Sequence, residues 1–217
     1  MNEKEIIEII QRELSEKTLG VTEQYLKIHS PIYIDNKLKI ERIDEENSDG
    51  LVIVYLPVFR EKFYFAVYIN AKTKEITNIG TEPHHRVYFI ATSENLTVEE
   101  LKAMTILQPT ELWNLGDFRN NQKRKYTYSG IKFLINPEPD EFEHKLNKLI
   151  DFLEQDARGI IELVQKANGY IQVAMDIHNG NTMLGGPYLN AETINRMSKL
   201  GLSISFDLYT AGNYFKN

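Results

Sequence analysis

The stretch PTELWNLGDFR, residues 109–119, contains the only tryptophan of the chain, Trp113, closely followed by Gly116 and Asp117. It lies between a segment with helical periodicity and a segment with strand-like alternation. Glycine accepts backbone conformations that other residues resist, and an aspartate side chain can hydrogen-bond to backbone amides in its own turn. The stretch therefore predicts a shaped turn, with Trp113 closing the end of a core, rather than a flexible connection.

The segments on either side of residues 109–119 predict alternating strands and helices. A helix follows Thr97, whose spacing to Glu100 is that of a capping box, and Asn190 is placed to cap a later short helix. The predicted elements, in chain order, are the strand Arg86–Thr92, the helix from Thr97, the strand Tyr126–Ile135, a long helix from about Asp140 to Ala167, the strand Tyr170–His178, the helix after Asn190 and the strand Leu202–Thr210.

These elements form two strand–helix–strand units joined by the long helix. Right-handed crossovers would place all three helices on one face of a four-stranded sheet. The expected architecture is a two-layer α/β sandwich related to ferredoxin-like folds.

The first 80 residues predict a smaller α+β domain. A helix from about Asn2 to Ser15 precedes several strand-like segments with turns between them, which indicates an antiparallel meander. Pro83 and the polar residues around it predict a junction at Gly80–His85, so the expected domains are residues 1–82 and 86–212. The adjacent His84 and His85 would point apart on an extended segment, which favours an exposed linker over a metal site.

Four stretches of the second half resemble a known bacterial family, domain of unknown function 4279. They are Val87–Phe89, Leu96–Leu101, Pro109–Asp117 with its Trp-x-x-Gly-Asp motif, and Leu200–Tyr209. The resemblance covers about residues 86–210 and leaves the first 80 residues outside. It supports the predicted boundary and fold class, and it implies no established activity.

Composition narrows the classes of function. The chain of 217 residues has a formal net charge of −6 and no cysteine, which excludes disulfides, thiolate metal sites and a cysteine nucleophile. Neither half is basic, which argues against binding to nucleic acid. No apolar run is long enough to span a bilayer and no signal peptide is recognisable, so we expect a cytoplasmic protein that does not bind membranes.

Polar side chains on two predicted strands form one candidate site. Asp176 and His178 alternate on one strand, and Asp207 and Tyr209 alternate on another. Together they could bind a metal or perform acid–base chemistry. The favoured interpretation is an exposed polar sheet face, or one packed on the first domain with paired side chains.

The residues around Trp113 form the other candidate site. Trp113, Gly116 and Asp117 are followed by Arg119, Lys123 and Arg124. Aromatic and arginine side chains are typical of protein interfaces, and they can also stack on single-stranded nucleic acid. For the basic run we favour an acidic protein partner, because the rest of the chain is acidic.

No catalytic or cofactor signature is recognisable, so we expect a non-enzymatic protein without a bound cofactor or metal. The leading hypothesis is a protein-binding factor of the immunity or antitoxin type, because acidic inhibitors often bind basic toxins. Two alternatives stay open. One is a small-ligand sensor using the glycine-rich loop Asn179–Tyr188, and the other is a metal-dependent hydrolase using Asp176, His178 and Asp207. The sequence does not determine the oligomeric state.

Overall fold

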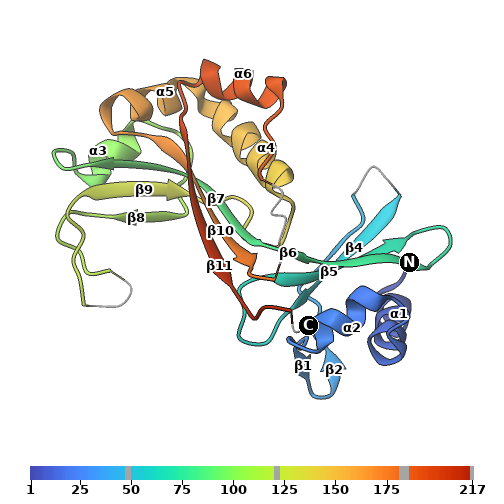
Figure 1. Cartoon of the computed structure of the whole chain (residues 1–217). Helices are drawn as coiled ribbons and strands as arrows, with labels where there is room; N and C mark the ends of the chain where they lie inside the picture. Colours follow the sequence, from blue (N-terminus) through green and yellow to red (C-terminus); the bar gives the residue numbers. More distant parts are fainter. Residues whose placement is uncertain (47–49, 120–122, 181–185, 216–217) are drawn as a thin grey trace. The chain divides into compact units, whose positions relative to one another are not determined.

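The computed structural model describes residues 1–46, 50–119, 123–180 and 186–215, and contains both helices and antiparallel sheets (Figure 1). The predicted α+β class is confirmed. Contacts divide the chain into two compact units. The first contains Met1–His84 with the described parts of Met175–Leu184 and Leu208–Asn217, and the second contains His85–Ala174 with the described part of Gly185–Asp207.

The first unit begins with helices α1 (Glu3–Glu16) and α2 (Gly20–Leu26) and a short hairpin of β1 (Tyr33–Ile34) and β2 (Lys37–Leu38). Its main sheet has the order β3-β4-β5-β6, and every neighbouring pair is antiparallel. The strands are β3 (Arg42–Asp44), β4 (Leu51–Pro57), β5 (Tyr64–Asn70) and β6 (Ile76–Glu82). The helix and meander are thus as predicted, whereas α2 was missed.

The core of the first unit lies between the helices and one face of this sheet. Ile6 and Ile10 of α1 belong to the same buried cluster as alternate residues of the two central strands, such as Val54 on β4 and Val67 on β5. Alternation places these side chains on one face of the sheet. The apolar side chains that recur along α1 therefore face the core, as the sequence predicts.

Glu13 joins α1 to α2. Its carboxylate is buried and accepts hydrogen bonds from the backbone N–H groups of Thr18 (3.2 Å) and Leu19 (3.1 Å) and from the hydroxyls of Thr22 (2.6 Å) and Thr18. Lys17, with φ 53°, ends α1 in the left-handed conformation and turns the chain toward this carboxylate. The second helix therefore begins at Gly20, directly after the residues whose N–H groups bond to Glu13.

The second unit is built on a five-stranded sheet with the order β11-β10-β7-β9-β8 (Figure 1). Strand β9 pairs antiparallel with both β7 and β8. The connection β7-α3-β8-β9-α4-β10 is the β-α-β-β-α-β arrangement of ferredoxin-like folds, to which α6 and β11 are added. The elements are β7 (His84–Ser93), α3 (Val98–Ala103), β8 (Glu111–Trp113), β9 (Ser129–Phe133), α4 (Phe142–Leu153), η1 (Glu154–Asp156), α5 (Ala157–Lys166), β10 (Tyr170–His178), α6 (Ala191–Lys199) and β11 (Ile204–Ala211).

The structure corrects two expectations about this unit and confirms a third. The sheet has five strands rather than four, because residues 111–113 form the edge strand β8. The long helix is interrupted by the 3₁₀ turn η1, where Asp156 accepts hydrogen bonds from the Thr105 hydroxyl (2.7 Å) and from the backbone N–H of Gly159 (3.1 Å). Both capping predictions are confirmed, with the full capping box at Thr97 and the side chain of Asn190 capping α6.

The stretch Gly80–His85 differs from the exposed linker that the sequence predicts. Residues 80–82 end β6 and residues 84–85 begin β7, and His85 is buried, so the stretch is not an exposed linker. The compact units are discontinuous in sequence, because segments near residues 175–180 and 208–215 pack with residues 1–84. The division into domains of residues 1–82 and 86–212 stays a prediction.

The carboxylate of Glu13 gives a pH-dependent contribution to stability. Burial raises its pKa, but the hydrogen bonds from Thr18, Thr22 and Leu19 outweigh burial, and the net pKa is lowered. A lowered pKa means that this contribution is present at neutral pH and is lost as the pH falls through the folded-state pKa. We expect Glu13→Gln to lower the free energy of unfolding by about 1–3 kcal/mol near pH 7 and to have less effect at about pH 3. Urea titrations will measure this, with the exposed Glu16→Gln as control, and equal stability of the two variants would contradict it.

A fragment that begins at Arg86 should not keep a fully native structure. It retains His178 and Phe215, but it lacks Tyr25 and Phe63, whose rings lie 5.9 Å and 4.8 Å from the ring of His178. We expect the fragment to bind hydrophobic dyes and to unfold less cooperatively than the whole chain. A fragment with a sharp thermal transition and no dye binding would show instead that residues 86–217 fold alone.

Candidate functional site

Trp113 ends the edge strand β8 and lies flat over a glycine of the neighbouring strand. It is directly opposite Gly130 of β9, and a Cβ added to Gly130 would lie 2.3 Å from Cζ2 of the indole. The indole is 8% exposed and stacks on Tyr126, with ring centroids 4.9 Å apart and planes at 23°. Only glycine at position 130 leaves room for this arrangement.

The turn after Trp113 is held by a dense set of backbone hydrogen bonds. Gly116, at φ +90°, donates from its N–H to the carbonyl of Tyr126 (2.9 Å), and the N–H of Tyr126 donates to the carbonyl of Asp117 (2.8 Å). The Asp117 carboxylate accepts from the N–H of Asn114 (2.7 Å). The predicted shaped turn is therefore present, with Asp117 bonded to an amide of its own turn.

Apolar side chains project from this hairpin into solvent. Leu112, Leu115 and Phe118 are 52%, 55% and 62% exposed. A depression of about 610 Å³ is lined by Leu112 and Phe118 together with Trp113 and Tyr126. Exposed apolar side chains therefore border the stacked rings of Trp113 and Tyr126.

Two basic residues of the hairpin, Arg119 and Lys125, lie over aromatic rings. The Arg119 guanidinium lies 5.0 Å from the centroid of Tyr126, and Lys125 Nζ lies 4.9 Å from the centroid of Phe118. The N–H of Arg119 donates to the carbonyl of Arg124 (2.8 Å), which continues the pairing of the two arms. We call Leu112, Leu115, Phe118, Arg119, Lys123, Arg124 and Lys125 the hairpin surface.

The other four predicted site residues differ in their exposure. Asp176 and His178 are buried in the first unit, whereas Asp207 and Tyr209 are exposed. Lys62 Nζ lies 3.8 Å from an oxygen of Asp176. The four residues therefore do not form one exposed polar face. Asp176 and His178 instead fit the alternative interpretation, in which the polar side chains are buried and paired.

The partner of His178 is a residue that sequence analysis missed. Nε2 of His178 lies 2.9 Å from Nε2 of His29, and both imidazoles are buried. The two residues are 149 positions apart, so no local spacing could indicate the pair. His29 follows α2, which was itself not predicted.

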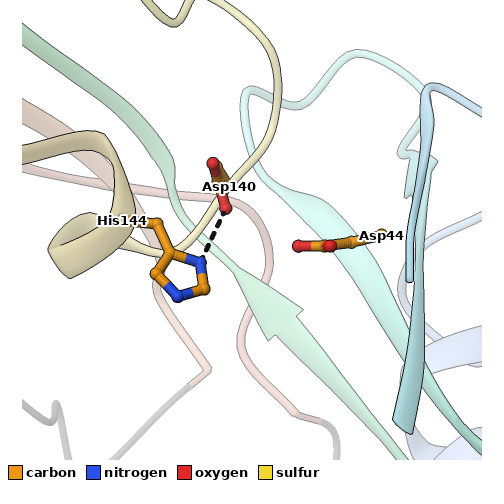
Figure 2. A group of neighbouring side chains, drawn as sticks. All are labelled: Asp44, Asp140 and His144. Carbon is orange, nitrogen blue, oxygen red and sulfur yellow. Dashed lines mark ion pairs between the residues drawn. The ribbon is translucent and has the colours of Figure 1, made fainter. Parts of the chain in front are cut away.

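A buried carboxylate also holds the start of α4 in the second unit. Asp140 is fully buried, accepts from Asn136 Nδ2 (2.7 Å) and Lys148 Nζ (3.1 Å), and pairs with His144 Nδ1 at 3.4 Å, the contact dashed in Figure 2. Lys145 Nζ donates nearby to the carbonyls of His85 and Asn136. Figure 2 also draws Asp44, a residue of the first unit that pairs with Arg42 at 3.2 Å. The contacts of Asp140 anchor the segment before α4.

The fold and these sites define an α+β protein whose second unit carries a ferredoxin-like sheet with a hairpin at its edge. The family model described as Domain of unknown function (DUF4279) matches residues 82–211, and the chain belongs to this family. The comparisons gave no match among the curated proteins and none among the solved structures. Among the described residues, no helix combines the length and apolar character needed to cross a membrane.

The hairpin makes two glycines sensitive to substitution. Gly130→Ala forces the indole of Trp113 to move, and we expect a loss of about 1–3 kcal/mol of stability. Gly116→Ala places a side chain at φ +90°, which should cost about 1–2 kcal/mol. Trp113 fluorescence during urea unfolding reports both changes, and Gly130→Ala should also shift the emission of the folded protein to the red.

Gly20→Ala is the matched control for both variants. An added Cβ at Gly20 meets no described atom within 4 Å, and its φ is not positive. If Gly130→Ala were as stable as this control, with unchanged emission, the close packing of Trp113 on Gly130 would be wrong.

Proposed function

We propose that the second unit binds an acidic protein partner through the hairpin surface. The observation that carries the proposal is the exposure of Leu112, Leu115 and Phe118 on the same hairpin as four basic residues. Exposed apolar side chains that gather in one place mark interaction sites more often than scattered ones do. Aromatic and arginine side chains are also the residues that contribute most to binding energy at interfaces.

The local charge selects the class of partner. Residues 111–128 contain four basic and two acidic residues in a chain whose net charge is −6. Glu111 is paired with Lys132 at 2.9 Å, and Asp117 accepts a backbone N–H inside the turn. The outward charge of the hairpin is therefore positive, and complementary potentials favour an acidic partner and speed its association.

Contacts within the described arms of the hairpin support the same conclusion. Backbone hydrogen bonds join Gly116 to Tyr126 and Arg119 to Arg124, and Arg119 and Lys125 lie over the rings of Tyr126 and Phe118. A surface ordered before binding loses less conformational entropy when a partner docks.

In an immunity or antitoxin-like role, the protein partner would be a toxin. The acidic net charge alone would suit a basic toxin, whereas the hairpin surface suits an acidic one. The two versions predict opposite effects of reversing the hairpin charges, and we favour the acidic partner because its site has defined geometry.

The two alternative functions have less support. The centre of the glycine-rich loop, residues 181–185, lies outside the described residues. The hydrolase hypothesis needs Asp176, His178 and Asp207 to act together, but two of them are buried and the third is exposed.

The test compares two triple variants with equal changes in charge. Arg119→Glu/Lys123→Glu/Arg124→Glu reverses the hairpin charge, and Lys37→Glu/Lys72→Glu/Lys102→Glu reverses three exposed lysines elsewhere. Proteins captured from the native cell are identified by mass spectrometry, and the binding of each purified partner is measured by calorimetry. We expect the hairpin variant to bind at least about tenfold more weakly, a loss of ~1.4 kcal/mol.

The control triple should bind an acidic partner within about twofold of the parent protein. Phe118→Asp, which keeps all four basic residues of the hairpin, should also weaken binding. A partner whose affinity falls equally in both triple variants would contradict the proposed surface. Tight binding of single-stranded RNA, lost only in the hairpin variant, would contradict the proposed class of partner.

A further inference from the structure

Three potential ligand atoms from distant parts of the sequence converge inside the first unit. Nε2 of His29 and Nε2 of His178 lie 2.9 Å apart, and the carbonyl oxygen of Asn213 lies 3.1 Å from Nε2 of His178. His29 follows α2, His178 ends β10 and Asn213 follows β11. Folding of the first unit brings these three segments together.

The hydrogen-bonding capacity of these atoms requires a positive centre between them. A carbonyl oxygen only accepts, and a neutral imidazole has one N–H and one lone pair. Nδ1 of His29 lies 3.7 Å from Glu61 Oε1. The centre is then either an Nε2 proton of one of the two imidazoles or a metal ion.

A carboxylate lies near the second ring nitrogen of His29. Glu61 Oε1 is 3.7 Å from Nδ1, so a small shift would give the carboxylate–histidine arrangement that orients histidine ligands at metal sites. Glu61 is thus a positioning residue, and its side chain is 16% exposed.

Aromatic rings enclose the two imidazoles. The ring of Phe63 lies 5.2 Å from His29 and 4.8 Å from His178, and Phe215 lies 5.6 Å from His178. An apolar shell limits access of water and strengthens coordination by neutral nitrogen ligands.

The C-terminal segment is shaped to approach this pair. Gly212 has φ +88°, and an added Cβ would lie 2.8 Å from Phe63, 3.0 Å from His178 and 3.1 Å from His29. The Asn213 side chain donates from Nδ2 to the carbonyl of Ile28 at 3.0 Å. Both features fix the Asn213 carbonyl beside the imidazoles.

We propose that His29 Nε2, His178 Nε2 and the Asn213 carbonyl bind one divalent transition-metal ion, for which Zn²⁺ is the best fit. Zn–N bonds of about 2.0–2.1 Å in a tetrahedral site place two nitrogens roughly 3.3 Å apart. The imidazoles need to separate by only a few tenths of an ångström. Two imidazoles and one oxygen suit Zn²⁺, Co²⁺ or Ni²⁺, whereas Mg²⁺ and Ca²⁺ prefer oxygen ligands throughout.

The experiment uses the full chain after treatment with a chelator. Zn²⁺ is titrated in competition with a chromophoric chelator, and Co²⁺ is followed by its visible absorption. We expect one ion per chain, a rise in Tm with Zn²⁺ and no rise with Mg²⁺, and cobalt bands of a four-coordinate site in which water is the fourth ligand. Binding of Zn²⁺ with no preference over Mg²⁺ would overturn the proposal.

Variants separate this site from adventitious binding by other histidines. His29→Gln should weaken Zn²⁺ binding about a hundredfold or more, and Glu61→Gln about tenfold. His84→Gln/His144→Gln removes two histidines outside the site and should leave affinity unchanged. Equal affinity of His29→Gln and this control would overturn the proposal.

Loss of a buried histidine can unfold the first unit, so a measurement on the unaltered protein is included. Nitrogen NMR of the imidazoles distinguishes a metal-bound Nε2 from a protonated one. Zn²⁺ should remove the Nε2–H of the pair and shift Nε2 of both His29 and His178. If an Nε2 proton of either imidazole persists at saturating Zn²⁺, the centre is a hydrogen bond and the proposal is wrong.

Discussion

The flat contact between the indole of Trp113 and the bare backbone of Gly130 determines how the edge of the five-stranded sheet ends. An indole can lie over a neighbouring strand only where that strand carries no side chain, so the strand pair and the glycine are required together. Tyr126 then covers the indole, and the backbone of Tyr126 closes the turn at Gly116. Each of these contacts positions the next one, so the place of Arg119 over Tyr126 depends on all of them.

Local signals in the sequence predicted local structure well. The capping box at Thr97, the cap at Asn190 and the apolar periodicity of α1 each depend on residues within a few positions, and each is present. The α+β class and the meander follow from the same kind of signal. The family resemblance over the second half was confirmed as well.

Features that depend on distant partners were not predicted. Helix α2 begins where the Glu13 carboxylate, seven residues before Gly20, accepts hydrogen bonds from the N–H of Leu19 and the hydroxyl of Thr22. Strand β8 is only three residues long and exists because β9 pairs with it. The approach of His29 to His178 spans most of the chain. For the candidate site, the sequence indicated the hairpin and its cations, but the exposure of Leu112, Leu115 and Phe118 required the structure.

The discontinuous first unit has a consequence for synthesis on the ribosome. Residues 1–84 emerge first, yet part of their packing comes from segments near residues 175–180 and 208–215. Tyr25, His29 and Phe63 meet His178 and Phe215 only after residues 178 and 215 have been translated. Until then the early segment exposes an incomplete core to chaperones and proteases. A chain whose synthesis stops before residue 208 therefore lacks part of its first unit, although the residues of the second unit have been made.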